Sequence, residues 1–590
     1  MRGLRGLGLV ALLATAGLGP RVGLLCASAS SAQSLPSGSG LPIERERPSL
    51  PAYEDEDEAP GLERPPESTP SPGTAPFAAG PGVLVRAFRI VGSTIFSDRE
   101  LAAVVAPWTA RVLHAEDLPQ VTDALTRLYV EAGYVSSGAF VPDQTLEDGT
   151  VEIRIVEGHV ERVELAPGGR LGLSFVEPRL RRGLAAPLDI DRLERALRLL
   201  QTDPRIARVD AVLLPGEARG SSVVRLAIEE ARSWDLTLRV ANDLAPSLGA
   251  NRANARFVHR NVAGFGDTFR ASVSGARGLF DLDLGYALPV TPWLTELELT
   301  GGLARGEVVE GPFQDDGFRN ELEDYGAWLA QPLWRTLEDE VRLVVGFERR
   351  SSRLSVDSGL PVRFETSDAN ASGSRIRLSL LRLEASWLHR GPDHVSALRL
   401  RTTQGLDVWD ATSPNSITPS DGVPALPDGE FTSWLLQLQH ARRVPTWLGD
   451  GELVARADAQ MATGALFSIE SFALGGASTV RGYRENAVVA DGGAVGSIEL
   501  RVPVLPTSLR PHELRVAPFF DVGFAWDTHD RDAADYDDWL AGIGFGLLYR
   551  YADRFELNAY WGRALRRPQT GEGGDLQGHG FHLEGKVFVF

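Results

Sequence analysis

The sequence predicts two small α+β modules followed by a large antiparallel β-barrel of about sixteen strands. Up to about Arg232, apolar stripes at helical spacing alternate with short strand-like runs, and this pattern occurs twice. From Trp234 to Phe590 the helical period disappears, and apolar and polar residues alternate instead. In that second part the connections alternate between short and long, which is typical of an up-and-down barrel that crosses a membrane.

The composition excludes several classes of function. The chain has 590 residues and a net charge of −19, which argues against a general nucleic-acid-binding surface. Its single cysteine is Cys26, so we expect no cysteine in the mature chain. The sequence contains neither a Gly-x-Ser-x-Gly motif nor a His/Cys cluster with metal-ligand spacing. We therefore predict no enzyme activity, no cofactor and no metal centre.

Residues 1–32 are predicted to be a secretory signal peptide. Arg2 and Arg5 precede an apolar run over residues 7–18, and small residues follow that run. The residue before Cys26 is not small, which argues against lipoprotein processing at this cysteine. Beyond the signal peptide, no stretch approaches the roughly 20 consecutive apolar residues of a transmembrane helix. The mature chain is expected to cross an oxidising compartment without disulfides.

Residues 33–82 are predicted to be a disordered linker, because they are rich in Pro, Ser, Gly and acidic residues. The acidic run at residues 54–58 fits a solvated tail better than a site for a metal or a basic partner. Beyond the linker we expect three domains: a first module at 83–158, a second module at 159–232 and the barrel at 233–590.

The first module is expected to have the order β-α-α-β-β. A strand over residues 84–91 precedes a helix that begins near Asp117 and stops at Gly133. Its later strands are expected at residues 136–141 and 150–156. Nothing in this module indicates catalysis, and the apolar stripe of the helix is expected to pack on a small sheet.

The second module repeats the pattern, with a helix that begins at Asp189. Its strands are expected at residues 160–165, 207–214 and 222–229. Each module has a sheet edge to which an extended peptide could add as a further strand.

The alternating segments of the barrel are expected to face lipid with their apolar side chains and the lumen with their Glu, Arg and Gln side chains. Short connections are expected at residues 262–266, 289–292, 389–392 and 551–554. Long connections are expected at residues 306–323, 351–374, 405–430, 463–492, 527–538 and 563–578. A soluble sandwich does not need this asymmetry, whereas an outer-membrane barrel shows it.

The candidate functional site lies in the glycine-rich connection 463–492, at Val480, Arg481, Gly482 and Tyr483. Downstream, Phe519, Asp521 and Gly523 share the less apolar face of a strand, which lines the lumen if the strands close into a membrane barrel. A loop arginine folded inward would then meet a buried carboxylate, which makes a buried charge tolerable. From these residues alone, an exposed loop cation and a solvated carboxylate explain the pattern equally well.

The last strand ends with Phe588 and Phe590. A terminal aromatic there resembles the recognition signal of outer-membrane barrels, which makes the barrel assembly machinery an expected partner. One departure is Leu583, which stands where a polar residue is usual.

Together these features resemble two-partner secretion outer-membrane translocators, the haemolysin activator (ShlB-type) family of POTRA-bearing barrels. The resemblance rests on segments in the family's order at residues 92–96, 133–134, 142–144, 148–149, 156–158, 200–206, 214–216, 261–267, 480–483 and 519–523. It implies a sixteen-stranded barrel in the bacterial outer membrane and two POTRA domains in the periplasm.

The resemblance also implies a site and a function. The sixth outer loop, between strands eleven and twelve, would fold into the lumen and pair Arg481 with Asp521 on strand thirteen. The POTRA domains would capture an unfolded partner polypeptide by strand addition, and the barrel would conduct it outward without ATP. The expected partners are this secreted polypeptide, outer-membrane lipid and the barrel assembly machinery.

Alternatives and one departure remain. The family usually has an N-terminal helix that plugs the barrel, but residues 34–82 show no apolar helical period, so the lumen is closed otherwise or the pore leaks. The rival functions are an assembly factor that inserts other barrels, a transporter for a surface lipoprotein or phospholipase-like partner, and a passive porin. The oxygen-rich loop 529–538 fits a solvated acidic loop better than a calcium site.

Overall fold

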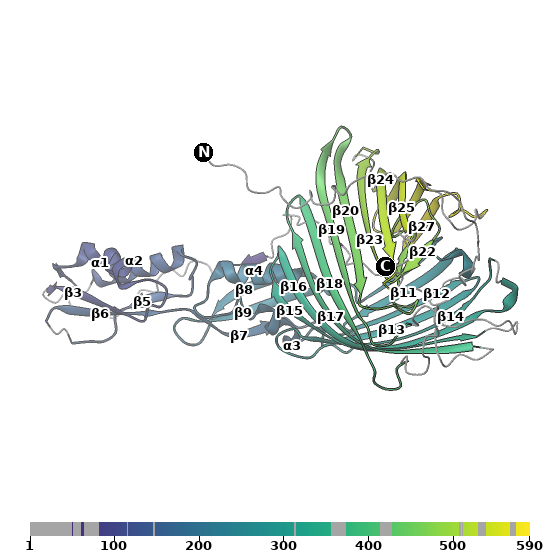
Figure 1. Cartoon of the computed structure of the whole chain (residues 1–590). Coiled ribbons are helices and arrows are strands. Elements are labelled where there is room, and N and C mark those ends of the chain that lie inside the picture. Colours follow the sequence, from purple (N-terminus) through teal and green to yellow (C-terminus); the bar gives the residue numbers. More distant parts are fainter. Residues whose placement is uncertain are drawn as a thin grey trace, which may run out of the picture. The chain divides into compact units, whose positions relative to one another are not determined.

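A computed structural model describes residues 50, 61–63, 82–114, 116–145, 148–311, 314–355, 373–412, 427–506, 509, 511–528, 538–566 and 574–589 (Figure 1). The predicted signal peptide with Cys26, most of the predicted linker, nearly all of the acidic loop 529–538 and Phe590 lie outside these residues. Within the described ranges, no helix is long and apolar enough to cross a membrane.

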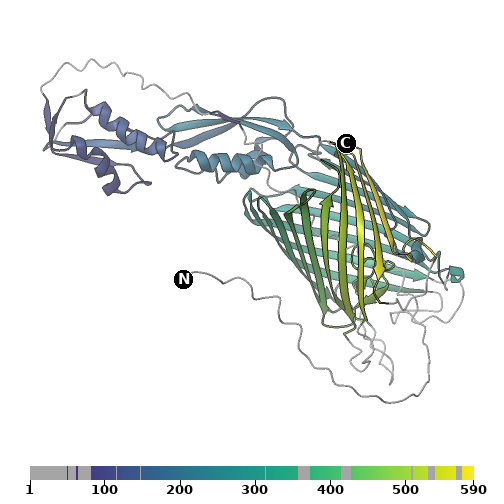
Figure 2. The ribbon, with the colours of Figure 1, turned by 90° about the horizontal axis from the view of Figure 1, so that it is seen from above.

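The first module is a small sheet covered by two helices. Its elements are β2 (Val83–Val85), β3 (Ala87–Val91), α1 (Asp98–Val105), η1 (Ala106–Trp108), β4 (Arg111–Leu113), α2 (Leu118–Glu131), β5 (Gly138–Phe140) and β6 (Thr150–Val156). The main sheet has the order β3-β6-β5, and β2 pairs with β4. Figures 1 and 2 show α1 and α2 on one face of this sheet, where Leu125 and Tyr129 of α2 join Val151 and Ile153 of β6 in one core.

Two details of this module differ from the prediction. The expected strand 84–91 is divided at Arg86, because the Arg86 backbone N–H donates to the Gly149 carbonyl (2.7 Å) instead of continuing one ladder. The short strand β4 was not predicted, since three residues are too few to show an alternation.

Tyr129 donates its hydroxyl to Ser93 Oγ (2.7 Å), and burial raises the pKa of Tyr129 to about 12.

The second module has the elements β7 (His159–Leu165), α3 (Leu173–Leu180), α4 (Ile190–Gln201), β8 (Ile206–Pro215) and β9 (Ser221–Glu230). Asp189 begins α4 as predicted, because its side chain accepts from the backbone N–H groups of Asp191 (2.9 Å) and Arg192 (3.1 Å). Helix α3 was not predicted, since it is only two turns long and contains Pro178.

The second module also contains one strand from the predicted linker. β1 (Gly61–Glu63) lies parallel to β8, with Gly61 opposite Asp210, and extends the sheet to the order β1-β8-β9-β7. Leu62 packs against the core of this module. The prediction of disorder is therefore wrong at residues 61–63, because an open sheet edge supplies hydrogen bonds and an apolar contact that a composition argument does not consider.

In the described part of the chain, sixteen strands form a closed antiparallel barrel, which confirms the predicted fold class. The first eight are β10 (Trp234–Ala241), β11 (Arg252–Arg260), β12 (Thr268–Ala276), β13 (Leu279–Pro289), β14 (Glu296–Glu307), β15 (Arg319–Arg335), β16 (Asp339–Ser355) and β17 (Gly373–Arg390). The other eight are β18 (His394–Leu406), β19 (Thr432–Thr446), β20 (Gly449–Ala462), β23 (Gly492–Pro503), β24 (His512–Trp526), β25 (Asp538–Tyr551), β26 (Phe555–Ala564) and β27 (Phe581–Phe588).

The barrel closes where β27 pairs with β10, from Phe588 opposite Thr237 to Glu584 opposite Ala241. Two short 3-10 turns, η2 (Pro246–Leu248) and η3 (Gln314–Asp316), lie in connections at one end of the strands. The short connections 262–266, 389–392 and 551–554 occur as predicted, between strands that follow one another in the sequence.

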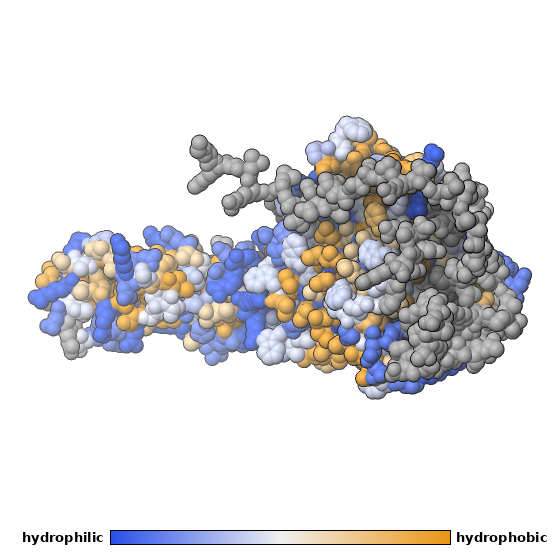
Figure 3. Space-filling view, viewed as in Figure 1, coloured by the Kyte–Doolittle hydropathy of each residue, from blue (hydrophilic) through white to orange (hydrophobic). Residues whose placement is uncertain are grey.

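The two faces of the strands differ as the alternation predicts. On β24, Phe520 and Phe524 point outward and are 43% and 50% exposed, whereas Phe519 and Asp521 are buried. Figure 3 shows hydrophobic residues gathered over the visible outer face of the barrel strands. Gln437, Asp458 and other polar residues are buried on the inner face. The outer face is thus suited to lipid and the inner face to charged groups.

Candidate functional site

The connection between β20 and β23, residues 463–491, folds against the inner face of the barrel and is called the lumen loop below. It joins the eleventh and twelfth strands in barrel order, and Asp521 lies on the thirteenth, β24, as the strand count predicts. The loop contains a hairpin of β21 (Phe472–Leu474) and β22 (Val488–Ala490). Phe472, Leu474 and Val480 are buried with inward residues of the wall, which include Val495 and Leu540.

Arg481 and Asp521 form a bidentate ion pair on this wall. Arg481 Nε donates to Asp521 Oδ2 (2.8 Å) and its terminal nitrogen donates to Asp521 Oδ1 (2.8 Å). The backbone N–H of Arg481 also donates to Oδ2 (3.0 Å). Asp521 is fully buried and Arg481 is 4% exposed. Charge-assisted bonds with this fork geometry are the strong class of hydrogen bond and fix the direction of the side chain.

A second carboxylate, Glu499 on β23, completes the charge balance. It forms an ion pair with Arg481, and it accepts from Arg501 Nε (2.7 Å) and from the Tyr560 hydroxyl (3.1 Å). Ser497, which is opposite Asp521 in the strand register, accepts from Arg481 (3.1 Å). We call Arg481, Ser497, Glu499 and Asp521 the Arg481 cluster. With two carboxylates facing Arg481 and Arg501, the buried charges cancel, as a buried site requires.

The face of the Phe519 ring packs against the guanidinium group of Arg481. The Arg481 Cζ atom lies 3.6 Å from the centroid of the Phe519 ring and 4.8 Å from that of Tyr560. A guanidinium over an aromatic face gains electrostatic energy, about 2 kcal/mol where water is excluded. Phe519 thus stabilises the guanidinium group of Arg481 in addition to the ion pair that Arg481 forms with Asp521.

Glycines let the loop approach the wall closely. Gly482 has a φ of +99°, and a Cβ there would lie 3.0 Å from the backbone of Gly562 on β26. A Cβ on Gly562 would lie 2.6 Å from the Gly482 nitrogen, and one on Gly542 would lie 2.0 Å from the Arg481 carbonyl oxygen. A Cβ on Gly523 would meet Leu474 at 2.9 Å. Because they carry no side chain, Gly542 and Gly562 leave room for the loop backbone, and Gly523 leaves room for the Leu474 side chain.

Tyr483 fixes the far side of the motif. Its hydroxyl lies 2.9 Å from the Arg566 carbonyl oxygen and 3.1 Å from that of Ala541. The next residue, Arg484, donates to Asp575 Oδ1 (2.8 Å) in the connection between β26 and β27. The loop tip therefore contacts the part of the barrel wall that extends from β23 to the connection between β26 and β27.

The structure brings most of the predicted site residues together. Val480, Arg481, Gly482 and Tyr483 of the loop meet Phe519, Asp521 and Gly523 of β24 at one place on the wall. Phe588 lies elsewhere, on β27 at the barrel closure, where its N–H donates to the Arg554 carbonyl (2.9 Å).

Sequence reasoning missed Glu499, Tyr560, Gly542 and Gly562. Glu499 had a usable signal, since it stands on the polar face of the alternating segment 498–502. Its relation to Arg481 depends on the register of β23 against β24, which the alternation alone does not fix.

Over the described residues, no group of three or more His, Cys, Asp or Glu side chains is arranged to hold a metal ion. The site is a set of ion pairs, an aromatic ring and close backbone contacts, and together these hold the lumen loop against the barrel wall.

Comparison with known proteins identifies the family. The family model of haemolysin secretion/activation proteins ShlB/FhaC/HecB matches residues 220–549, which is more than half of the chain. The chain belongs to this family. The model of the ShlB-type POTRA domain matches residues 83–158 of the same protein.

Individual relatives agree with this assignment. The ShlB/FhaC/HecB-family chain is 26% identical over 442 residues to the outer membrane transporter CdiB of Escherichia coli, covering 72% of this chain and 70% of the relative. The solved structure of CdiB from Escherichia coli matches with a TM-score of 0.61 and 21% identity, covering 88% of this chain and 93% of that one.

A BamA structure from Haemophilus ducreyi, lacking POTRA domains 1–3, shares the fold with a TM-score of 0.53 and 14% identity, covering 85% of this chain and 99% of that one. That likeness concerns the fold alone. The family match therefore favours a secretion protein over an assembly factor, and it places the barrel in the outer membrane and the POTRA domains in the periplasm.

Proposed function

We propose that this protein exports one partner polypeptide across the outer membrane, with the POTRA domains capturing the unfolded chain and the barrel conducting it. The observation that carries this proposal is the lumen loop, whose Arg481 is held by Asp521 and Glu499 inside the barrel. A passive porin has no use for two peptide-binding modules and a buried, releasable loop. Membership in a family of secretion proteins supports the same function.

In this mechanism, the exported chain adds to a free sheet edge of a POTRA domain and is delivered to the periplasmic end of the barrel. The Arg481 cluster fixes the lumen loop in its resting position. Because the pair is buried and bidentate, its partners separate only when other contacts replace them. The motif residues Val480, Gly482, Tyr483, Phe519 and Gly523 position the loop around that pair.

Two further partners follow from the barrel surface. Outer-membrane lipid would cover the outward apolar side chains, such as Phe520 and Phe524. The barrel assembly machinery would recognise the last strand, where Phe588 lies in β27, together with Phe590.

The experiment compares cells with and without this protein by proteomics of the medium, the cell surface and the outer membrane. Loss of one large protein from the medium or surface, with other barrels unchanged, is the expected result. A broad fall in outer-membrane barrels would instead show an assembly factor and overturn the proposal.

A variant series tests the role of Arg481 in the same cells. Arg481→Ala is expected to reduce export while the barrel still inserts, because it leaves Asp521 and Glu499 buried without their shared cation. Arg305→Ala on β14 is the matched control, since Arg305 is exposed and pairs with Glu321 away from the loop. Full export by a normally inserted Arg481→Ala protein would remove this role.

A further inference from the structure

A second cluster of buried charges holds the lumen loop on a different part of the barrel wall. Glu470 of the loop accepts from Arg382 of β17 (2.9 Å) and from Arg350 of β16 (3.2 Å). Glu348 of β16 accepts from the Nε atoms of the same two arginines, at 2.7 Å each. We call Glu348, Arg350, Arg382 and Glu470 the Glu470 cluster.

This cluster is also deeply buried, and its charges are balanced within the four residues. All four side chains are at most 11% exposed. Two carboxylates face two guanidinium groups, so the cluster is neutral only while Glu470 is in place. Arg382 also donates to Thr403 (3.1 Å) on β18, which fixes the wall side independently of the loop. Without Glu470, Arg350 and Arg382 would keep only one carboxylate of the cluster, Glu348, as their shared partner.

Apolar contacts bring the same part of the loop to the same wall. Leu466, Phe467 and Ile469 form one buried group with Leu378 and Leu380 of β17. Phe467 is fully buried. Residues 463–471, which we call the first limb of the lumen loop, therefore have both a charged and an apolar attachment.

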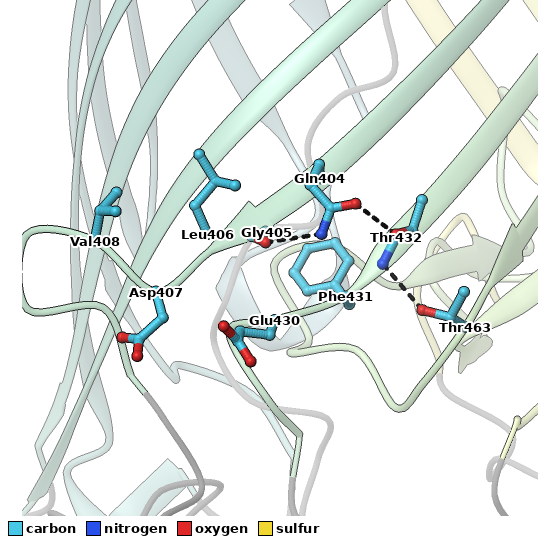
Figure 4. Close-up of a pocket in the computed structure, with 9 residues that line it drawn as sticks. All are labelled: Gln404, Gly405, Leu406, Asp407, Val408, Glu430, Phe431, Thr432 and Thr463. Carbon is cyan, nitrogen blue, oxygen red and sulfur yellow. Dashed lines mark hydrogen bonds between the residues drawn. The ribbon is translucent and has the colours of Figure 1, made fainter.

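Figure 4 shows the start of this limb. Thr463 accepts from the Thr432 backbone N–H (3.0 Å) at the end of β19, and Thr432 in turn donates to Gln404 of β18 (2.6 Å). A pocket of about 520 Å³ lies here, between the ends of β18 and β19 and Thr463. The limb thus leaves the end of β20 beside Thr432 of β19 and then contacts β16 and β17.

The two clusters lie on separate sectors of the barrel. β16 and β17 are the seventh and eighth strands in barrel order, whereas β23 and β24 are the twelfth and thirteenth. The lumen loop is therefore attached to the barrel wall at two places that lie five strands apart in barrel order.

We propose that Glu470 is a second positioning residue of export: it holds the first limb against β16 and β17, so that the lumen loop is a strap fixed at two walls. Passage of a polypeptide then requires the first limb to detach from Arg350 and Arg382 on the wall. This step is needed in addition to any displacement of Arg481 from Asp521 and Glu499. This inference rests on the proposed export function for its biological role, but the two attachments of the strap are contacts within this chain.

The test measures ion conductance of the full-length protein in planar lipid bilayers and protease cleavage within 463–471. Glu470→Gln keeps the size of the side chain and removes its charge. Because breaking a buried ion pair strongly favours the separated state, we expect cleavage in the first limb to rise on the order of 100-fold and the conductance to increase. Glu470→Asp is expected to recover part of the wild-type behaviour.

The matched control is Glu384→Gln. Glu384 lies on β17 two residues from Arg382, and it forms ion pairs with Arg401 (2.8 Å) and Arg399 (4.0 Å) of β18. The barrel is first shown to be assembled by its heat-dependent mobility. Arg382→Gln and the double variant Glu470→Gln/Arg382→Gln complete a cycle in which the two effects are expected to be non-additive.

Two results would overturn the proposal. One is a Glu470→Gln barrel with wild-type conductance and cleavage. The other is strict additivity both in this cycle and in the same cycle made with Arg350→Gln, which would mean that Glu470 acts through neither of its two arginine partners. Export in cells is scored separately: a wild-type protein that exports nothing contradicts the proposed function, whereas the conductance and cleavage data still decide whether the strap exists.

Discussion

At the scale of the residue, the lumen of this barrel shows how buried charge is made tolerable. Arg481 is surrounded by two carboxylates, a hydroxyl and an aromatic ring, so protein groups bind its guanidinium group directly. Removing one partner of a buried pair costs on the order of 3–5 kcal/mol, mostly because the remaining charge stays buried. Such a pair is therefore suited to hold a loop in place. Removing one partner is unfavourable, whereas the two side chains can separate when each gains a new partner of opposite charge.

The glycines of the wall lead to the first residue-scale prediction. Gly562→Ala is expected to displace the loop tip, because the new Cβ would lie 2.6 Å from the backbone nitrogen of Gly482. We expect faster protease cleavage within 475–485 and reduced export, with the barrel assembled. Gly496→Ala on β23 is the control, since a Cβ there meets nothing within 4 Å. Equal behaviour of the two variants would show that the close approach at Gly562 has no role in holding the loop.

At the scale of the element, the hairpin β21–β22 is the apolar half of the attachment. Phe472 is 1% exposed and packs with Leu474, Val480 and Val495, so it fixes the hairpin on the wall that carries the Arg481 cluster. The two kinds of contact act together, since burial of the apolar side chains excludes water from the ion pairs and strengthens them.

Phe472→Ala is therefore expected to loosen the hairpin. Truncating a buried phenylalanine typically costs about 3–5 kcal/mol, and here that cost falls on a local contact between loop and wall rather than on the barrel. Hydrogen exchange of residues 472–490 should become faster while the exchange of β16 and β17 stays unchanged. Val489→Ala, on the neighbouring strand but outside the buried group, is the control. Unchanged exchange in Phe472→Ala would mean that the ion pairs alone hold the hairpin.

The elements also show what sequence could and could not predict. Strong periodicity predicted α2 and α4, and alternation predicted the faces of the barrel strands, because each reflects burial of one face. α3 has too few turns and a proline, and β1 depends on an edge that another part of the chain supplies. Arg481 and Asp521 could be named from their residue types and strand phase. The alternation also places Glu499 on the polar face, but the partners of Glu499 and Glu470 could not be predicted, because barrel register and loop path determine them.

At the scale of the whole molecule, the modules and the barrel are stabilised separately. Each POTRA domain has its own hydrophobic core, and the barrel has a closed ladder of hydrogen bonds that leaves no edge. The proposed function is divided in the same way, since we propose peptide capture by the sheets of the modules and control of passage by the lumen loop. Removing one module is thus expected to impair its own task without unfolding the rest.

Deletion of residues 83–158 is expected to abolish capture of the partner polypeptide and hence its export. The barrel should still insert and keep its heat-dependent mobility, because none of its sixteen strands in the described chain comes from this segment. Binding is measured by co-purification of the partner with the shortened and the full-length protein, and export by the amount of partner in the medium. Unchanged binding to the shortened protein would assign capture to the second module or the barrel and would contradict a role for the first module.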